Sequence, residues 1–143
     1  MIKVKRISQN AIIPEAQTKG SVGADLHACI PDDIVIYPGD TVKIPTGIAM
    51  EIPEGYGGFI FARSGLATKQ GLAPANKVGV IDSDYRGEII VAIHNHAEQI
   101  CRIEPNQRIA QIVIIPCMKP EFCVVEDLIE TERDTGGFGS TGK

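Results

Sequence analysis

The prolines are the feature that most limits how this chain can fold, because each one removes a backbone N–H and interrupts a helix. The 143 residues contain nine prolines, and fifteen glycines are spread among them. The prolines stand at positions 14, 31, 38, 45, 53, 74, 105, 116 and 120. The stretches between them are short and rich in Ile and Val. Many short β-branched stretches separated by turn signals predict an all-β protein, either a β-sandwich or a barrel.

Nine of these stretches are predicted strands. They are Ile2–Ile7, Ile34–Tyr37, Thr41–Ile44, Ile48–Ile52, Gly58–Ala62, Lys77–Ile81, Glu88–Asn95, Arg108–Ile115 and Phe122–Val125. The single predicted helix is Ser64–Gln70, with Ser64 as its N-cap and Gly71 at its end. Ile89–Ile93 and Ile112–Ile115 are apolar on both faces, which predicts strands that are covered on both sides. In so small a domain a second copy of the chain can supply one cover, so we expect an oligomer.

Size and composition fit one ordinary globular domain. Hydrophobic residues make up 43% of the chain and charged residues 22%, as in typical soluble proteins. The net charge of −4 argues against broad nucleic-acid binding, which needs a cationic face. The first residues, Met-Ile-Lys-Val-Lys, show no apolar signal region, and no stretch is long enough to span a membrane. We therefore predict a cytoplasmic protein with neither a nucleic-acid nor a membrane partner.

The cysteines and the C-terminal residues give two further expectations. Cys29, Cys101, Cys117 and Cys123 lack a CxxC pair, so we interpret them as free thiols, with two disulfides in a secreted protein as the alternative. Residues 133–143 contain four glycines and little apolar surface, which predicts a flexible glycine-rich tail. We expect residues 1–132 to form a single domain and the tail to close over a ligand.

The stretch Gly79–Glu88 combines turn residues with residues that suit a binding site. An apolar strand runs into Asp82 and Asp84, then into an aromatic residue and Arg86, and turns at Gly87. Asp, Ser and Gly are expected at a turn, but an aromatic residue and an arginine are not required there. The stretch is therefore either the tip of a β-hairpin or a binding corner.

Other residues also have both a structural and a functional interpretation. Ser64 can cap the predicted helix or bind a phosphate at its N-terminus. His94 and His96 can bind zinc from one strand face, or they are polar residues at a strand end. Asp25 is either a turn residue or a functional acid. Residues 137–143 satisfy GxxxxGK, but a P-loop also needs a buried strand before it and a helix after it, so we do not expect a Walker-type ATPase.

Five stretches taken together resemble the all-β dUTP diphosphatase (dUTPase) family, and they occur in the family's order. They are GSVGADL at 20–26, ARSGLA at 62–67, the corner at 76–87, QRIAQI at 107–112 and the glycine-rich tail from residue 133. The resemblance implies a homotrimer of distorted jelly-roll subunits, each with one short helix, whose active sites are shared between subunits. It also implies hydrolysis of dUTP to dUMP and diphosphate with Mg²⁺. That reaction keeps uracil out of DNA and supplies dUMP for thymidylate synthesis.

The resemblance implies a role for each matching residue. Asp82 would be the catalytic base that orients and activates water for attack on the α-phosphorus. Asp84 would then be structural and pair with Arg86. Asn76 would bind the uracil edge, and Tyr85 would pack on the deoxyribose and leave no room for a 2′-hydroxyl. Asp25 would hold a water on Mg²⁺, whose main ligands are the substrate phosphates. The other substrate-binding residues are Arg63, Ser64, Gly65 and Gln111 at the phosphates, Phe138 over the uracil, and Arg133, Gly139, Ser140 and Thr141 in the tail.

Two positions depart from the family pattern. Ala24 stands where the family usually has a larger apolar residue, and Asp134 where it usually has glycine.

Two rival functions remain. A dCTP deaminase-like enzyme on the same fold would use a glutamate near the base, for which Glu88 is the candidate. A non-catalytic nucleotide-binding β-protein would have no need for Asp82.

Overall fold

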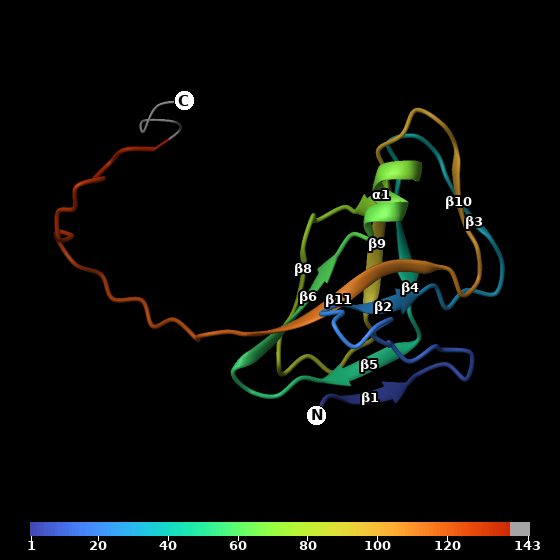
Figure 1. Ribbon diagram of the computed structural model, residues 1–143, viewed down its shortest axis with the longest axis horizontal. Coiled ribbons are helices and arrows are strands. Elements are labelled where there is room, and N and C mark those ends of the chain that lie inside the picture. Colours follow the sequence, from blue (N-terminus) through green and yellow to red (C-terminus); the bar gives the residue numbers. More distant parts are fainter. Residues whose placement is uncertain (138–143) are drawn as a thin grey trace.

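The computed structural model describes residues 1–137 of the 143-residue chain. Its regular structure consists of strands and one short helix (Figure 1). The strands are β1 (Lys3–Arg6), β2 (Ala24–His27), β3 (Ile34–Ile36), β4 (Thr41–Pro45), β5 (Ile48–Glu51), β6 (Tyr56–Phe61), β7 (Leu72–Pro74), β8 (Gly79–Ile81), β9 (Ile90–Asn95), β10 (Cys101–Ile103) and β11 (Arg108–Pro116). The helix is α1 (Ser64–Gln70). The predicted all-β class with one short helix is confirmed.

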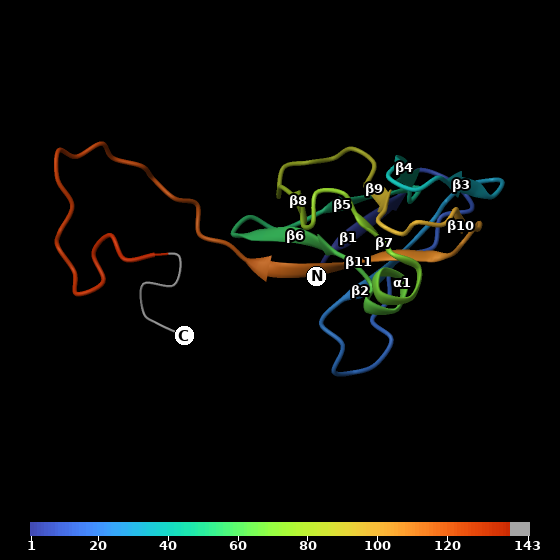
Figure 2. The ribbon, with the colours of Figure 1, turned by 90° about the horizontal axis from the view of Figure 1, so that it is seen from above.

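Two larger sheets pack around one apolar core (Figures 1 and 2). One sheet has the strand order β2-β11-β6-β8 and the other β4-β9-β7, and every pairing is antiparallel. The strand pairs β1–β5 and β10–β3 complete the regular structure. Ile60 and Ile112 from the first sheet and Val91 and Ile93 from the second belong to the same buried cluster. Each buried Ile side chain contributes about 1.5–3 kcal/mol, so this shared core holds the sandwich together.

The strand predictions failed at four places. Strands β2, β7 and β10 were not predicted, because each has only three or four residues and carries Asp, Pro or Arg. The strand predicted at Phe122–Val125 is wrong, since this stretch has no regular structure in the chain. Its Phe122 and Val124 are 93% and 99% exposed. A strand needs a neighbour for its backbone groups, and residues 1–137 of a single chain provide none there.

The bounds of the helix are as predicted, but its N-cap is not. The carbonyl of Arg63 accepts the first helical hydrogen bond, from the Ala67 N–H at 2.9 Å. Arg63 is therefore the N-cap, with extended backbone at φ −85° and ψ 126° and no side-chain cap bond. Ser64 is the first helical residue, so its hydroxyl is not used as a cap. Gly71 ends the helix with a left-handed φ of 67°, as predicted.

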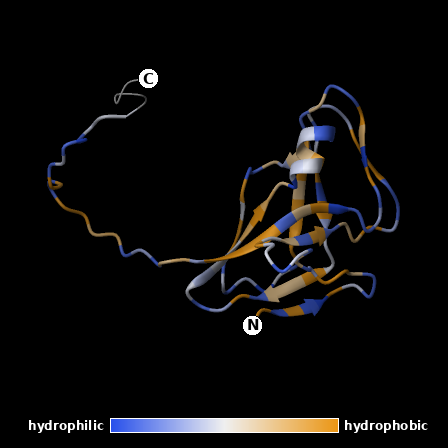
Figure 3. Cartoon of the chain, viewed as in Figure 1, coloured by the Kyte–Doolittle hydropathy of each residue, from blue (hydrophilic) through white to orange (hydrophobic). Residues whose placement is uncertain are grey.

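Beyond β11 the chain leaves the two sheets. Residues 117–137 form no helix or strand and extend away from the body of the molecule (Figures 1 and 2). Apolar stretches lie along this segment (Figure 3). The large apolar side chains, which are between 55% and 99% exposed, are Met118, Phe122, Val124, Val125, Leu128 and Ile129. Folded monomers rarely leave such a series of apolar side chains uncovered, which suits a segment that contacts a partner.

Strand β9 likewise has a second face that the single chain covers only in part. Val91 and Ile93 are buried, whereas Ile90 is 46% exposed. The double cover predicted from the apolar pattern is thus incomplete within one chain, and the oligomer stays a prediction. All four cysteines are free, which confirms the thiol interpretation. Over residues 1–137, no helix is long and apolar enough to cross a membrane.

Candidate active site

A cavity of about 280 Å³ lies where β2, β11 and the start of α1 meet. The register of β11 creates it, because Gln111 is paired with Asp25 of β2 on one side and with Phe61 of β6 on the other. Helix α1 follows β6 after only two residues, so its first turn reaches the same place. The predicted residues that line this phosphate cavity, as we name it, are Asp25, Arg63, Ser64, Gly65 and Gln111.

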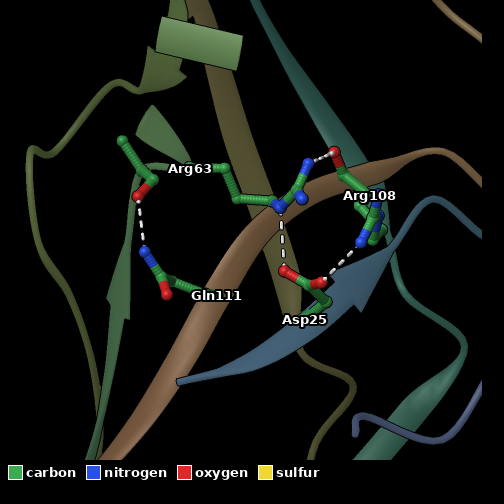
Figure 4. A network of polar contacts seen from close by, with 5 residues as sticks. Asp25, Arg63, Arg108 and Gln111 are labelled. Carbon is green, nitrogen blue, oxygen red and sulfur yellow. Dashed lines mark hydrogen bonds and ion pairs between the residues drawn. The ribbon is translucent and has the colours of Figure 1, made fainter. Parts of the chain in front are cut away.

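Asp25 is buried at the edge of the phosphate cavity beneath two arginines (Figure 4). The Arg63 Nε donates to Asp25 Oδ1 at 2.8 Å, and the Arg108 Nη1 donates to Asp25 Oδ2 at 3.3 Å. Asp25 is only 7% exposed, and a buried carboxylate requires such partners to offset its lost hydration. The carboxylate fixes both guanidinium groups, and each can still donate from its other N–H groups.

Gln111 is held by contacts on both sides of its side chain. Its Nε2 donates to the Ala62 carbonyl at 3.0 Å (Figure 4). Its Oε1 lies against Gly23, where an added β-carbon would overlap the amide. Gly23 therefore leaves the space in which the Gln111 amide stands, and Ala62 fixes its orientation. The predicted phosphate residue is positioned before any ligand arrives.

Arg108 is a member of the site that the sequence reasoning did not single out. Its ion pair with Asp25 joins residues that are 83 positions apart, so sequence spacing gave no sign of it. The available signal was its place in the stretch QRIAQI, where only Gln111 was assigned a role. Strand β11 has a register shift between Arg108 and Ala110, opposite β2. Bulges of this kind often redirect a side chain next to a functional site.

His27 lies next to the same charges, at the end of β2. Burial lowers the pKa of His27 below its usual 6.5; the Asp25 carboxylate opposes this shift, while Arg108 and Arg63 add to it. The His27 Nδ1 is buried and has no hydrogen-bond partner among residues 1–137. A neutral imidazole is therefore favoured here, because a third positive charge beside two arginines would be poorly solvated.

The corner between β8 and β9 holds Asp82 and Tyr85 in a turn. The Tyr85 N–H donates to the Asp82 carbonyl at 3.1 Å, and the Tyr85 hydroxyl donates to the Glu88 carbonyl at 3.0 Å. The Tyr85 ring lies over Gly87, where an added β-carbon would overlap it. Asn76 lies beside the start of β8, where its Nδ2 would be 3.4 Å from a β-carbon on Gly79. We call this group of Asn76, Asp82 and Tyr85 the nucleoside corner.

Two expectations about the nucleoside corner are wrong. It is not the tip of a hairpin, because β8 pairs with β6 whereas β9 pairs with β4 and β7. The corner is instead a connection between the two sheets. Asp84 does not pair with Arg86, whose Nη1 donates to the Ser83 carbonyl at 2.7 Å and to the Tyr85 carbonyl at 3.0 Å. Arg86 thus closes the turn through carbonyl groups, which are closer to it than the exposed carboxylate.

The nucleoside corner and the phosphate cavity are separate in the single chain. Asp82 lines a different cavity of about 850 Å³, together with Asp84, Arg86 and Tyr56. None of the five predicted phosphate-cavity residues borders this second space. The fold therefore gathers the five predicted phosphate-binding residues in one place and puts the predicted base Asp82 in another.

The tail and the histidine pair add little to the site as described. Arg133 is exposed, and its Nε donates to the Gly136 carbonyl at 2.9 Å. Asp134 has a left-handed φ of 39°, a conformation that glycine adopts more readily. Phe138, Gly139, Ser140 and Thr141 lie outside the described residues. The rings of His94 and His96 are 4.3 Å apart, but residues 1–137 contain no cluster of three or more potential metal ligands.

A family model described as dUTPase matches residues 9–142. The chain belongs to the dUTPase family. Among relatives named deoxyuridine 5′-triphosphate nucleotidohydrolase, that of Desulfitobacterium hafniense is 53% identical over 131 residues, covering 91% of this chain and 87% of the relative. That of Nautilia profundicola is 49% identical over 142 residues, covering 99% of both chains.

A solved dUTPase has a closely similar fold. The dUTPase of Staphylococcus bacteriophage 80alpha, solved with dUpNHpp, superimposes with a TM-score of 0.92 at 32% identity, covering 100% of this chain and 99% of the other. This agreement confirms the jelly-roll class that the resemblance implied. The five stretches that suggested a dUTPase therefore identified the family correctly.

Proposed function

We propose that this dUTPase-family chain hydrolyses dUTP to dUMP and diphosphate, with Asp82 as the general base. The observation that carries the proposal is the state of Asp82: its side chain is exposed at a fixed turn, and no group of residues 1–137 donates a hydrogen bond to its carboxylate. This unpaired carboxylate is free to accept a proton from water and to orient that water toward the α-phosphorus.

The phosphate cavity suits the triphosphate part of such a substrate. Arg63 supplies positive charge, Ser64 supplies a hydroxyl, and Gly65 leaves open space, since nothing lies within 4 Å of an added β-carbon there. Gln111 adds an amide that is already oriented by Ala62. Fixed donors of this kind stabilise developing negative charge without reorganising, and they account for most of the catalysis expected in phosphoryl chemistry.

The nucleoside corner suits a deoxyribonucleoside. The Tyr85 ring is held in place by two contacts. Its hydroxyl donates a hydrogen bond to the Glu88 carbonyl, and the ring packs against Gly87. A rigid ring against the sugar leaves no room for a 2′-hydroxyl and so discriminates against UTP. Asn76 presents an amide to the base edge, and an amide that pairs with uracil meets reversed donor and acceptor positions in cytosine.

The residues of the phosphate cavity fit an Mg²⁺ ion that arrives with the substrate. Mg²⁺ keeps several waters and binds through few carboxylates and through substrate phosphates. Among residues 1–137, Asp25 is the single carboxylate that lines the phosphate cavity, and each of its oxygens accepts a hydrogen bond from one arginine and retains a second lone pair. Asp25 would therefore hold the ion through a water, and the ion would neutralise charge on the phosphates.

A homotrimer with shared active sites accounts for the separated halves of the site. The phosphate cavity of one chain and the nucleoside corner of another would face each other across a subunit interface. The exposed apolar side chains of residues 117–129 would then pack against the surface of a neighbouring subunit. The tail from Arg133 through Phe138 to Thr141 would close over the substrate from a neighbouring chain. In the cytoplasm this reaction would keep uracil out of DNA and supply dUMP.

The position of Glu88 argues against the deaminase alternative. Its Oε1 accepts a hydrogen bond from the Gly47 N–H at 2.7 Å, and its side chain is only partly exposed. Glu88 thus bridges two connecting segments instead of presenting a free carboxyl group to a base. A general acid or base must reach the reacting atom, which this geometry does not favour.

A substrate panel tests the proposed activity. Diphosphate release is measured from dUTP, UTP, dTTP and dCTP, each with Mg²⁺ and with EDTA. We expect rapid release from dUTP with Mg²⁺, little from the other three nucleotides, and a large loss with EDTA. Equal turnover of UTP would refute the role of Tyr85. Deamination of dCTP would favour the rival enzyme.

A further inference from the structure

A second cavity of about 500 Å³ lies beside the phosphate cavity and shares Arg63 and Gly65 with it. Its walls come from one side of α1, from the turn before β11 and from the end of β2. It contains none of the nucleoside-corner residues and is nearly twice the volume of the phosphate cavity. We call it the rear cavity.

Positive charge dominates the rear cavity. Arg63, Lys69 and Arg108 line it, and no carboxylate of residues 1–137 does. Asp25 lies outside its wall and offsets one of these charges through its bonds to both arginines. Lys69 makes no ion pair with any of residues 1–137. Asp25 leaves two of the three positive charges without a counterion, so an anion that enters this space relieves their repulsion.

Neutral hydrogen-bonding groups complete the lining. Gln107 accepts the Glu104 N–H with its Oε1 at 2.8 Å, which leaves its Nε2 as a donor, and Gln70 and Asn106 carry further amides. His27 also lines the cavity, with a buried Nδ1 that lacks a partner among the described residues. Several donors around a cationic space match the many acceptor oxygens of a phosphate.

We propose that the rear cavity is a second anion site, which binds inorganic phosphate or diphosphate while a nucleotide occupies the phosphate cavity. The shared residue Arg63 couples the two, because its Nε donates to Asp25 and its Nη1 to the Arg108 carbonyl, which leaves its Nη2 without a partner among residues 1–137. Diphosphate is the product of the proposed function, and to that extent the inference rests on it. Binding of the anion itself does not require turnover.

Calorimetry on the intact protein tests the second site. The protein is saturated with dUpNHpp in phosphate-free buffer and titrated with diphosphate, and in a separate arm with orthophosphate. We expect one further anion per chain. If diphosphate binds more tightly than orthophosphate, the ligand of the rear cavity is the reaction product. If orthophosphate binds equally or more tightly, the ligand is free inorganic phosphate from solution.

Three variants locate the bound anion. Lys69→Gln removes a cation and is expected to weaken anion binding about tenfold, as for one charge-assisted hydrogen bond. Gln70→Glu adds a carboxylate of the same shape and should weaken it at least as much. Lys43→Gln is the control, because this exposed lysine lies on β4, away from the cavity. All three should keep wild-type turnover of dUTP.

Three results would overturn the inference: no anion bound beyond dUpNHpp, competition between diphosphate and dUpNHpp, or equal weakening by Lys43→Gln. If dUpNHpp itself fails to bind, the proposed function is refuted. The titration is then made on the free protein, where two anions per chain support the rear cavity and one overturns it. The two proposals can therefore fail independently.

Discussion

Asp25 shows how one residue organises the phosphate cavity. Its carboxylate holds Arg63 and Arg108 in place, so the ordering of two flexible side chains is complete before a ligand binds. The motif around Asp25 indicated a functional acid, but its arginine partners lie 38 and 83 residues away in sequence. No local pattern can predict such pairs, because they depend on how β2, β11 and α1 meet.

Asp82→Asn should abolish hydrolysis and preserve binding. The amide has the same shape but cannot accept a proton, so we expect kcat to fall by about 10²–10⁴-fold with little change in KM. Asp84→Asn is the matched control, because Asp84 is an exposed acid in the same turn. Steady-state kinetics with dUTP measures both. An active Asp82→Asn variant would refute the assignment of the base, whereas a wild-type protein that binds dUTP without hydrolysing it would favour a non-catalytic binding protein.

His27 should make stability depend on pH. Because burial lowers its pKa below 6.5 in the folded chain, the unfolded chain binds the proton more readily. The contribution is therefore complete above pH 6.5 and is lost as the pH falls toward the lowered value. Urea unfolding from pH 7.5 to 5 should show a shallower loss of stability in His27→Gln than in the wild type. Parallel curves for the two proteins would contradict this.

At the scale of elements, the longer strands could be predicted and their partners could not. Stretches rich in Ile and Val, such as β9 and β11, can be predicted as strands from their composition. The nucleoside corner looked like a hairpin because β8 and β9 are close in sequence, yet they belong to different sheets. Pairing is decided by burial of both sheets against a common core, which is a property of distant segments.

Gly71→Ala should destabilise the fold more than Gly39→Ala. Both glycines have left-handed φ, 67° and 79°, so both alanine variants lose about 1–2 kcal/mol from backbone strain. An added β-carbon at Gly71 would lie 2.9 Å from the Ala97 nitrogen, whereas nothing lies within 4 Å at Gly39. Urea denaturation compares the free energies of unfolding. Equal losses would show that the end of α1 yields freely at Ala97.

At the scale of the whole molecule, one chain holds both halves of the proposed active site but keeps them apart. The phosphate cavity and the nucleoside corner border different spaces, and the segment after β11 carries apolar side chains into solvent. The sequence suggested an oligomer through its doubly apolar strands. It could not show which halves meet, because that depends on the relative placement of subunits.

Mixing two inactive variants tests the shared site most directly. Asp82→Asn disables the nucleoside corner, and Ser64→Asp places a carboxylate in the phosphate cavity at a helix start, where it suits the fold but repels phosphate. Each variant alone should be inactive toward dUTP. After the two are unfolded and refolded together in equal amounts, random trimers should leave about a quarter of the sites intact and restore that share of activity. A mixture as inactive as its components would contradict an active site built from more than one chain.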